Sequence, residues 1–138
     1  MEKRYFETQI EVRYRDTDSM GHVIASVYYE YMMHAYLSFM HKLMDIPMED
    51  KIPQIMGRSS CEYVKPARYG DLILVRSSVT RFGTKSLDVE YLMESVGGVG
   101  HRIATGSSSH IMYDYKVRRP ILISDAFKKS VLDFQTRL

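Results

Sequence analysis

The chain has 138 residues, a net charge of +2 and 45% hydrophobic residues, so it is long enough for one domain with a substantial apolar core. The near balance of charges excludes the strongly basic composition of a typical nucleic-acid-binding protein. The single cysteine, Cys61, excludes an internal disulfide and fits a reducing compartment. No apolar run approaches the ~18 residues of a membrane span, and residues 1–15 lack the apolar core of a signal peptide. We therefore expect a cytoplasmic protein of one domain, residues 1–138, with no nucleic-acid or membrane partner.

The first half of the chain predicts one strand and one long helix. Residues 8–15 alternate between apolar and polar side chains, which is typical of a half-buried strand. The apolar side of this strand carries Ile10, Val12 and Tyr14. Residues 26–44 have the spacing of a helix with almost two apolar faces, whereas a surface helix usually has one. We expect this helix to cover a sheet and to contact a partner subunit or an apolar ligand as well, unless it is simply a core helix.

The second half predicts mostly strands and a final helix. The expected strands are residues 58–64, 72–81, 85–95 and 102–115. One face of the third carries Leu87, Val89, Tyr91 and Met93. Residues 124–138 have helical spacing, with Ser124 as the N-cap. Short turns between strands favour an antiparallel sheet. The fold class is therefore α+β, with about five antiparallel strands covered by the long helix and followed by a short C-terminal helix.

Several common active-site patterns are missing from the sequence. The five histidines form no HExxH pair and no Cys/His cluster, so no metal site is expected. There is no GxSxG elbow for a nucleophilic serine, and Cys61 lies within a strand pattern, as a buried structural thiol would. Residues 96–101 predict a glycine-rich hairpin tip and lack the GxxxxGK[ST] pattern of a phosphate loop.

The remaining chemical feature is an acidic pair in the stretch RYRDTDSMGH, residues 13–22. Asp16 and Asp18 stand two apart, shortly before the long helix. One interpretation is a solvated loop with an Asx-type turn or a helix cap. The other is a reactive carboxylate, because the free N–H groups and partial positive charge of a helix N-terminus stabilise an anion. Such a carboxylate attacks a carbonyl or deprotonates water, while a backbone N–H at the helix start stabilises an oxyanion.

This stretch and three others resemble one family. RYRDTDSMGHVIASVYYEYM is similar to the signature of the 4-hydroxybenzoyl-CoA thioesterase-like acyl-CoA thioesterases, with matches at Asp16, Asp18, Gly21, His22, Val23 and Tyr28. EYVKPARYGDLILV, FGTKSLDVEYLM and the segment from HIMYDY to RRPILIS match in the same order, so the resemblance covers nearly the whole chain. It implies the hot-dog fold, in which a bent antiparallel sheet wraps a long helix. It also implies a homodimer or homotetramer with active sites at the dimer interface.

The resemblance implies roles for individual residues as well. Asp18 is the expected catalytic carboxylate, Asp16 supports the loop, and a backbone N–H near Ala25 polarises the thioester carbonyl. The expected substrate-binding residues are Gly21, His22 and Tyr28 near the acyl group, and Lys85 and Arg119 on the nucleotide phosphates. Many members carry Asn at positions 24 and 25, and others carry His or Tyr at 25. Ile24 and Ala25 therefore leave only the backbone donor in this chain.

The function implied by the resemblance is hydrolysis of an acyl-CoA thioester to a free acid and coenzyme A. Asp18 would act as nucleophile or as general base, and no metal or organic cofactor is needed. Glu30, on the polar ridge of the long helix, corresponds to a second catalytic layout among hot-dog thioesterases. The main alternative is a non-catalytic acyl-CoA-binding protein, because a fold does not fix a function. A dehydratase acting on thioesters and a domain kept only for assembly are further alternatives.

Overall fold

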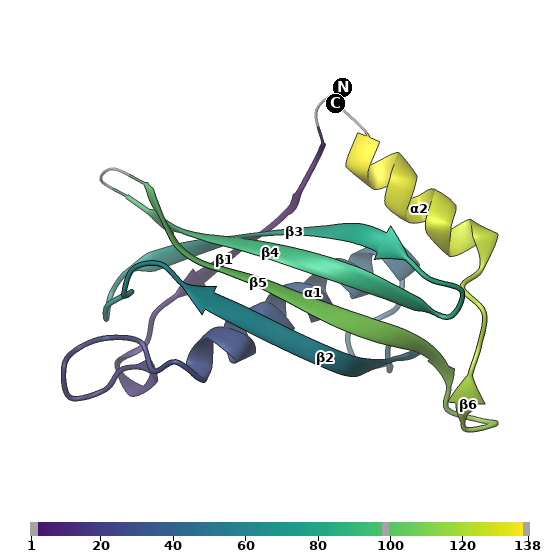
Figure 1. The fold of residues 1–138 in the computed structure, drawn as a ribbon, viewed down its shortest axis with the longest axis horizontal. Coiled ribbons are helices and arrows are strands. Elements are labelled where there is room, and N and C mark those ends of the chain that lie inside the picture. Colours follow the sequence, from purple (N-terminus) through teal and green to yellow (C-terminus); the bar gives the residue numbers. More distant parts are fainter. Residues whose placement is uncertain (1–2, 98–99, 137–138) are drawn as a thin grey trace.

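The computed structural model describes residues 3–97 and 100–136, and these form one twisted antiparallel sheet with a long helix against one face (Figure 1). The strands are β1 (Phe6–Glu11), β2 (Gln54–Tyr63), β3 (Leu72–Phe82), β4 (Ser86–Val96), β5 (His101–Asp114) and the two-residue β6 (Arg119–Pro120). The helices are α1 (Val27–Met44) and α2 (Asp125–Thr136), with a short 3-10 helix at Tyr14–Asp16. The predicted α+β arrangement is confirmed.

The strand order is β1-β3-β4-β5-β2, and β6 pairs with the end of β5. The predicted antiparallel pairing is confirmed, and hairpins join β3 to β4 and β4 to β5. The strand β2 does not pair with β3, the next strand in the chain, but with β5, and it lies at the edge of the sheet. The chain therefore crosses from one side of the sheet to the other between Tyr63 and Leu72. This crossing places the segment 64–71 at the same end of the sheet as the start of α1 (Figure 1).

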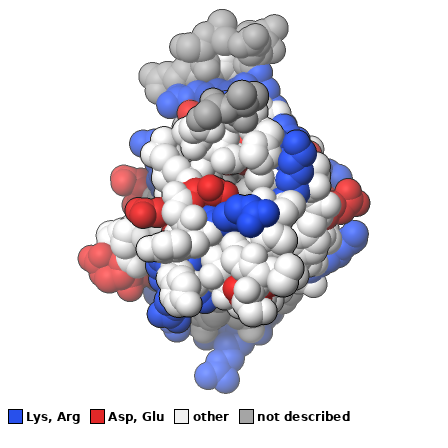
Figure 2. All heavy atoms as spheres, turned by 90° about the vertical axis from the view of Figure 1, so that its left-hand side faces the viewer, with Lys and Arg blue, Asp and Glu red and all other residues white. Residues whose placement is uncertain are grey.

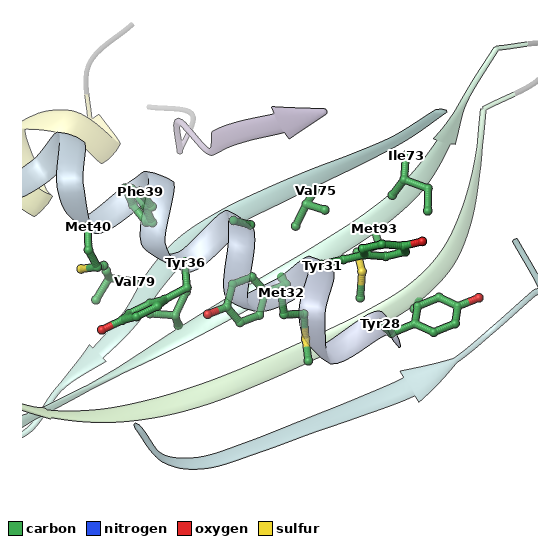
Figure 3. Close-up of a cluster of buried hydrophobic side chains, with 14 of the residues drawn as sticks. Tyr28, Tyr31, Met32, Tyr36, Phe39, Met40, Ile73, Val75, Val79 and Met93 are labelled. Atoms are coloured by element: carbon green, nitrogen blue, oxygen red, sulfur yellow. The ribbon is translucent and has the colours of Figure 1, made fainter. Parts of the chain in front are cut away.

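The core lies between α1 and the inner face of the sheet. Side chains of α1 point toward the sheet (Figure 3): Tyr28 packs on Tyr63 of β2, and Tyr36 stacks on His110 of β5. Val75 of β3 and Met93 of β4 are fully buried in the same core. The predicted inward face of β4 is confirmed, because its four residues are all buried: Leu87, Val89, Tyr91 and Met93.

At Gly106 of β5 the helix approaches the sheet so closely that a Cβ atom would collide with the sulfur of Met32. The same Cβ atom would lie 3.1 Å from the backbone oxygen of Ser60. The packing of Met32 and this strand therefore favours glycine here, and not a special backbone conformation.

A series of connected polar side chains crosses this apolar core. The Nε2 atom of His110 lies 2.7 Å from Oγ of Ser108, which in turn lies 2.7 Å from the hydroxyl of Tyr91. The Tyr36 ring stacks on the His110 ring, with centroids 3.8 Å apart and planes 5° from parallel. The Tyr36 hydroxyl donates to the side-chain oxygen of Gln54. Burial lowers the pKa of His110 to about 4, so this imidazole is neutral at physiological pH.

The predicted ends of the elements hold to within a few residues, with one exception. The first strand ends at Glu11, and the chain then turns through the 3-10 helix, so Tyr14 is 78% exposed and not on the buried side with Val12. Ser124 caps α2 as predicted, because its Oγ accepts the N–H of Phe127 at 3.1 Å. Residues 98–99 of the predicted hairpin tip and residues 137–138 of the predicted final helix lie outside the described residues.

In the described part of the chain, no helix has both the length and the apolar character needed to cross a membrane.

Candidate active site at the start of the long helix

The acidic loop forms a tight turn that is organised by Asp18. One carboxylate oxygen of Asp18, Oδ1, accepts the N–H of Met20 at 2.9 Å and the N–H of His22 at 3.2 Å. The Asp18 backbone N–H donates to the His22 carbonyl, and Gly21 donates to the Asp18 carbonyl. Gly21 has a φ of +79°, which favours glycine at this position. The other carboxylate oxygen, Oδ2, accepts no hydrogen bond from the described residues, so it is available to a ligand.

Asp16 has a different environment, although it is only two residues away. Its side chain is buried and accepts hydrogen bonds from the Arg13 backbone N–H at 3.0 Å, the Arg13 guanidinium at 3.1 Å and the Tyr31 hydroxyl at 2.8 Å. Burial by itself raises the pKa of this carboxyl, but these donors outweigh it and hold the pKa below its ordinary value. Asp16 thus ties the loop to α1. The geometry suits the supporting role predicted for it, which stays a prediction.

The loop leads into α1 through the segment 24–27. The N–H of Ile24 donates to the Asp16 carbonyl at 2.9 Å, and the N–H of Val27 donates to the Ile24 carbonyl at 2.9 Å. Ser26 stands at the N-cap of α1, but its side chain makes no capping hydrogen bond. No acceptor within residues 3–97 and 100–136 takes the N–H of Ala25. A polarised donor is therefore free at the helix start, where the helix dipole favours negative charge.

A surface pocket of about 410 Å³ joins the loop, the helix start and the end of β2. Its lining includes four of the predicted site residues, Asp18, His22, Ala25 and Tyr28. Figure 2 shows the end of the molecule that carries this loop, and most of the surface there is uncharged. Tyr28 forms the buried floor, with its hydroxyl accepting the N–H of Ala67 at 3.2 Å. The structure thus brings a carboxylate, a helix N-terminus and an aromatic wall together.

Two further pocket residues, Tyr63 and Lys65, were not predicted from the sequence. Tyr63 is the last residue of β2, and its hydroxyl donates to the Ala25 carbonyl at 2.8 Å. Lys65 follows in the loop after β2 and lines the pocket with Asp18. The only sequence signal for either residue is its place within the EYVKPARYGD match. Nothing in the local pattern says that this segment meets the helix start.

Lys85 and Arg119 lie elsewhere in the chain. The Lys85 carbonyl accepts the N–H of Met112, which pairs with Gln54 at the beginning of β2. Arg119, in β6, pairs with Asp114 at the same end of the sheet. The pocket contains Tyr63, at the other end of β2. Within one chain, neither cation therefore reaches the pocket (Figure 1). Their predicted phosphate contacts stay a prediction.

Glu30 is exposed on α1 and belongs to another surface hollow, between α1 and β1, together with His34 and Arg13. It does not line the pocket that contains Asp18. In the described residues, no three histidine, cysteine, aspartate or glutamate side chains come together in a way that could hold a metal ion.

The sequence profile of the thioesterase-like superfamily matches residues 12–131. The chain belongs to this superfamily. Residues 12–131 include the acidic loop, α1 and the whole pocket. A sequence comparison with curated proteins finds no significant match.

Three solved structures with the same fold carry the name thioesterase. A thioesterase from Thermus thermophilus, complexed with coenzyme A and Zn, has a TM-score of 0.84 at 23% identity, covering 96% of this chain and 95% of that one. A 1,4-dihydroxy-2-naphthoyl-CoA thioesterase from Synechocystis has a TM-score of 0.77 at 19% identity, covering 94% and 96%. A mutant 4-hydroxybenzoyl CoA thioesterase complexed with 4-hydroxybenzoyl CoA has a TM-score of 0.78 at 15% identity, covering 93% and 99%. The predicted hot-dog fold of this superfamily member is confirmed.

Proposed function

We propose that this protein hydrolyses an acyl-CoA thioester to a free acid and coenzyme A in the pocket that contains Asp18. The observation that carries the proposal is the presence of two complementary groups in one pocket. Asp18 offers a carboxylate oxygen without a hydrogen bond, and Ala25 offers a backbone N–H without an acceptor among the described residues. Membership in the thioesterase-like superfamily supports the reaction class. The neighbours complexed with coenzyme A and with 4-hydroxybenzoyl CoA support the substrate class.

The two groups define the reaction. The N–H of Ala25 donates to the thioester oxygen as that oxygen gains charge, which is the role of an oxyanion hole. Asp18 Oδ2 either attacks the carbonyl carbon or takes a proton from an attacking water. In the first route the C–S bond breaks, the coenzyme A thiolate leaves, and water hydrolyses the resulting anhydride. In the second, hydroxide adds directly and the thiolate leaves in the same way. Neither route requires a metal or an organic cofactor.

We propose in addition that the active unit is a homodimer joined through the edge strand β2. This strand has ten residues, which span roughly 33 Å, and its outer edge has no partner among the described residues. Two copies of β2 paired antiparallel about a two-fold axis would continue the sheet. The Tyr63 end of one copy would then lie beside the Gln54 end of the other. This pairing would bring Lys85 and Arg119 of the second copy toward the pocket of the first, where they could bind the phosphates.

The reaction is tested by measuring release of free thiol from short-chain, long-chain and aromatic acyl-CoAs. In Asp18→Asn we expect kcat to fall by about 10²–10⁴, the usual range for one acid–base group. The side chain is exposed and Asn can still accept the N–H groups of Met20 and His22, so the fold is retained. Saturable acyl-CoA binding by the wild type without thiol release would refute the proposed activity, and so would full activity of Asp18→Asn.

The dimeric site is tested by mixing two inactive variants, Asp18→Asn and Lys85→Glu. If Lys85 serves the pocket of the other copy, each mixed dimer contains one intact site and one site with both substitutions. Random assortment then restores roughly a quarter of wild-type activity. The control is a mixture of Asp18→Asn with Asp18→Ala, which restores none. No recovery in a mixture whose mass shows dimers would contradict the shared site.

A further inference from the structure

The start of α1 contains a four-residue turn with a peptide that no helix hydrogen bond holds. The carbonyl of Ile24 accepts the N–H of Val27 at 2.9 Å, which closes a turn over residues 24–27. The peptide that joins Ala25 to Ser26 is at the centre of this turn. Full reversal of this peptide would require a positive φ at Ser26, which serine disfavours, whereas a smaller tilt leaves the closing hydrogen bond intact. A tilt would redirect the Ala25 carbonyl and the Ser26 N–H and would shift the neighbouring Ala25 N–H.

The usual device for fixing a helix start is missing here. A serine at the N-cap normally accepts an N–H of the first turn with its side chain. Ser26 instead has φ −68° and ψ −23° and makes no such bond. A group from outside the helix can therefore restrict the tilt of the central peptide where the side-chain cap does not.

Tyr63 supplies that group from the end of β2. Its hydroxyl donates to the Ala25 carbonyl at 2.8 Å. Its ring packs edge-on against the Tyr28 ring, with centroids 5.0 Å apart and planes at 76°, and Tyr28 is fixed in turn by the N–H of Ala67. Desolvation, together with the neighbouring Cys61, raises the pKa of the Tyr63 hydroxyl, which stays protonated and remains a donor at neutral pH.

We propose that Tyr63 is a positioning residue for the oxyanion donor: its hydroxyl holds the Ala25–Ser26 peptide so that the N–H of Ala25 stays directed into the pocket. This inference rests on the proposed thioester hydrolysis. The two peptide planes that meet at Ala25 are then held at their carbonyls, one by Val27 and one by Tyr63. A hydrogen bond to a carbonyl also polarises the amide chain to which it belongs, which strengthens the donors at the helix start.

The size of the effect follows from the role. Complete removal of an oxyanion donor costs about 10²–10³ in kcat. Loss of the Tyr63 hydroxyl leaves the Ala25 N–H in place but less well directed, so we expect kcat to fall about tenfold. The Michaelis constant should change little, because the thioester oxygen carries its charge only in the transition state.

The test compares Tyr63→Phe with the wild type and with Tyr69→Phe. Tyr63→Phe removes one oxygen atom and keeps the ring that packs on Tyr28. Tyr69→Phe is the matched control, because Tyr69 is exposed, contacts only the ring of Tyr14 among the aromatic residues described, and does not line the pocket. Steady-state kcat and KM are measured by thiol release, and inhibition by free coenzyme A reports on substrate binding.

The expected result is a fall in kcat of about tenfold for Tyr63→Phe, with unchanged KM and unchanged inhibition by coenzyme A, and wild-type values for Tyr69→Phe. An unchanged kcat, or a change confined to KM, would overturn the inference while leaving the hydrolase proposal intact. A wild-type protein that releases no thiol from any acyl-CoA would instead refute the proposed function itself.

Discussion

Acidification should destabilise this protein before the pH reaches the range in which the hydrogen-bonded carboxyls of Asp16 and Asp88 take up protons, and the cause is His110. The imidazole is fully buried, with Tyr36 of α1 stacked on one face and Ser108 bonded to Nε2. Burial lowers its pKa from 6.5 to about 4, and Asp88 of β4 opposes this shift only in part. A buried neutral histidine must be charged or exposed when protons are added. The unfolded chain therefore binds the proton more tightly than the folded one.

The magnitude follows from the two pKa values. Each tenfold difference in proton affinity is about 1.4 kcal/mol, so the interval between 6.5 and about 4 corresponds to roughly 3 kcal/mol of unfolding free energy. This contribution is fully present above pH 6.5 and is lost as the pH falls toward 4. Between pH 7.5 and pH 4.5 the loss should be roughly 2–3 kcal/mol. The pKa of Asp16 and that of Asp88 are lowered from 3.8. The stability that comes from these two carboxylates is therefore lost only below this pH range.

Urea unfolding followed by far-ultraviolet circular dichroism at several pH values measures the effect, with the protein concentration held fixed because the proposed dimer would add to stability. His110→Gln should be less stable at pH 7.5 but should lose much less stability than the wild type on acidification. His34→Gln, at an exposed position of α1, should keep the wild-type pH dependence. A wild-type loss below about 1 kcal/mol, or an equal loss in His110→Gln, would refute the argument.

Three further substitutions test other parts of the structure. Asp16→Asn should cost about 1–3 kcal/mol of stability in urea unfolding, because it weakens a buried acceptor of three donors, and it should lower kcat less than Asp18→Asn does. Gly106→Ala should cost about 1–3 kcal/mol through collision with Met32; wild-type stability would show that α1 does not pack so closely. Ser124→Ala should cost about 1 kcal/mol by removing the cap of α2, and an unchanged melting temperature would contradict that cap.

Local patterns in the sequence were sufficient for most secondary structure and for the acidic loop. The alternation that places Leu87, Val89, Tyr91 and Met93 on one face depends only on the two-residue repeat of a strand, and all four are buried. The cap at Ser124 depends on neighbours three residues away. The motif from Asp18 to His22 likewise closes its own turn through bonds that span at most four residues. Interactions of such short range depend on neighbouring residues in the sequence, so the local sequence is enough to predict them.

The tertiary structure decided what short-range patterns do not contain. The position of β2 at the sheet edge follows from its pairing with β5, more than forty residues later in the chain. The apolar–polar alternation within each strand does not indicate which distant strand it pairs with. The same crossing brings Tyr63 onto the Ala25 carbonyl and Lys65 into the pocket beside Asp18. His110 lies in a strand of serines, and its burial depends on Tyr36 reaching it from α1. The sequence determined which residues could react, whereas the packing of distant segments determined which of them meet.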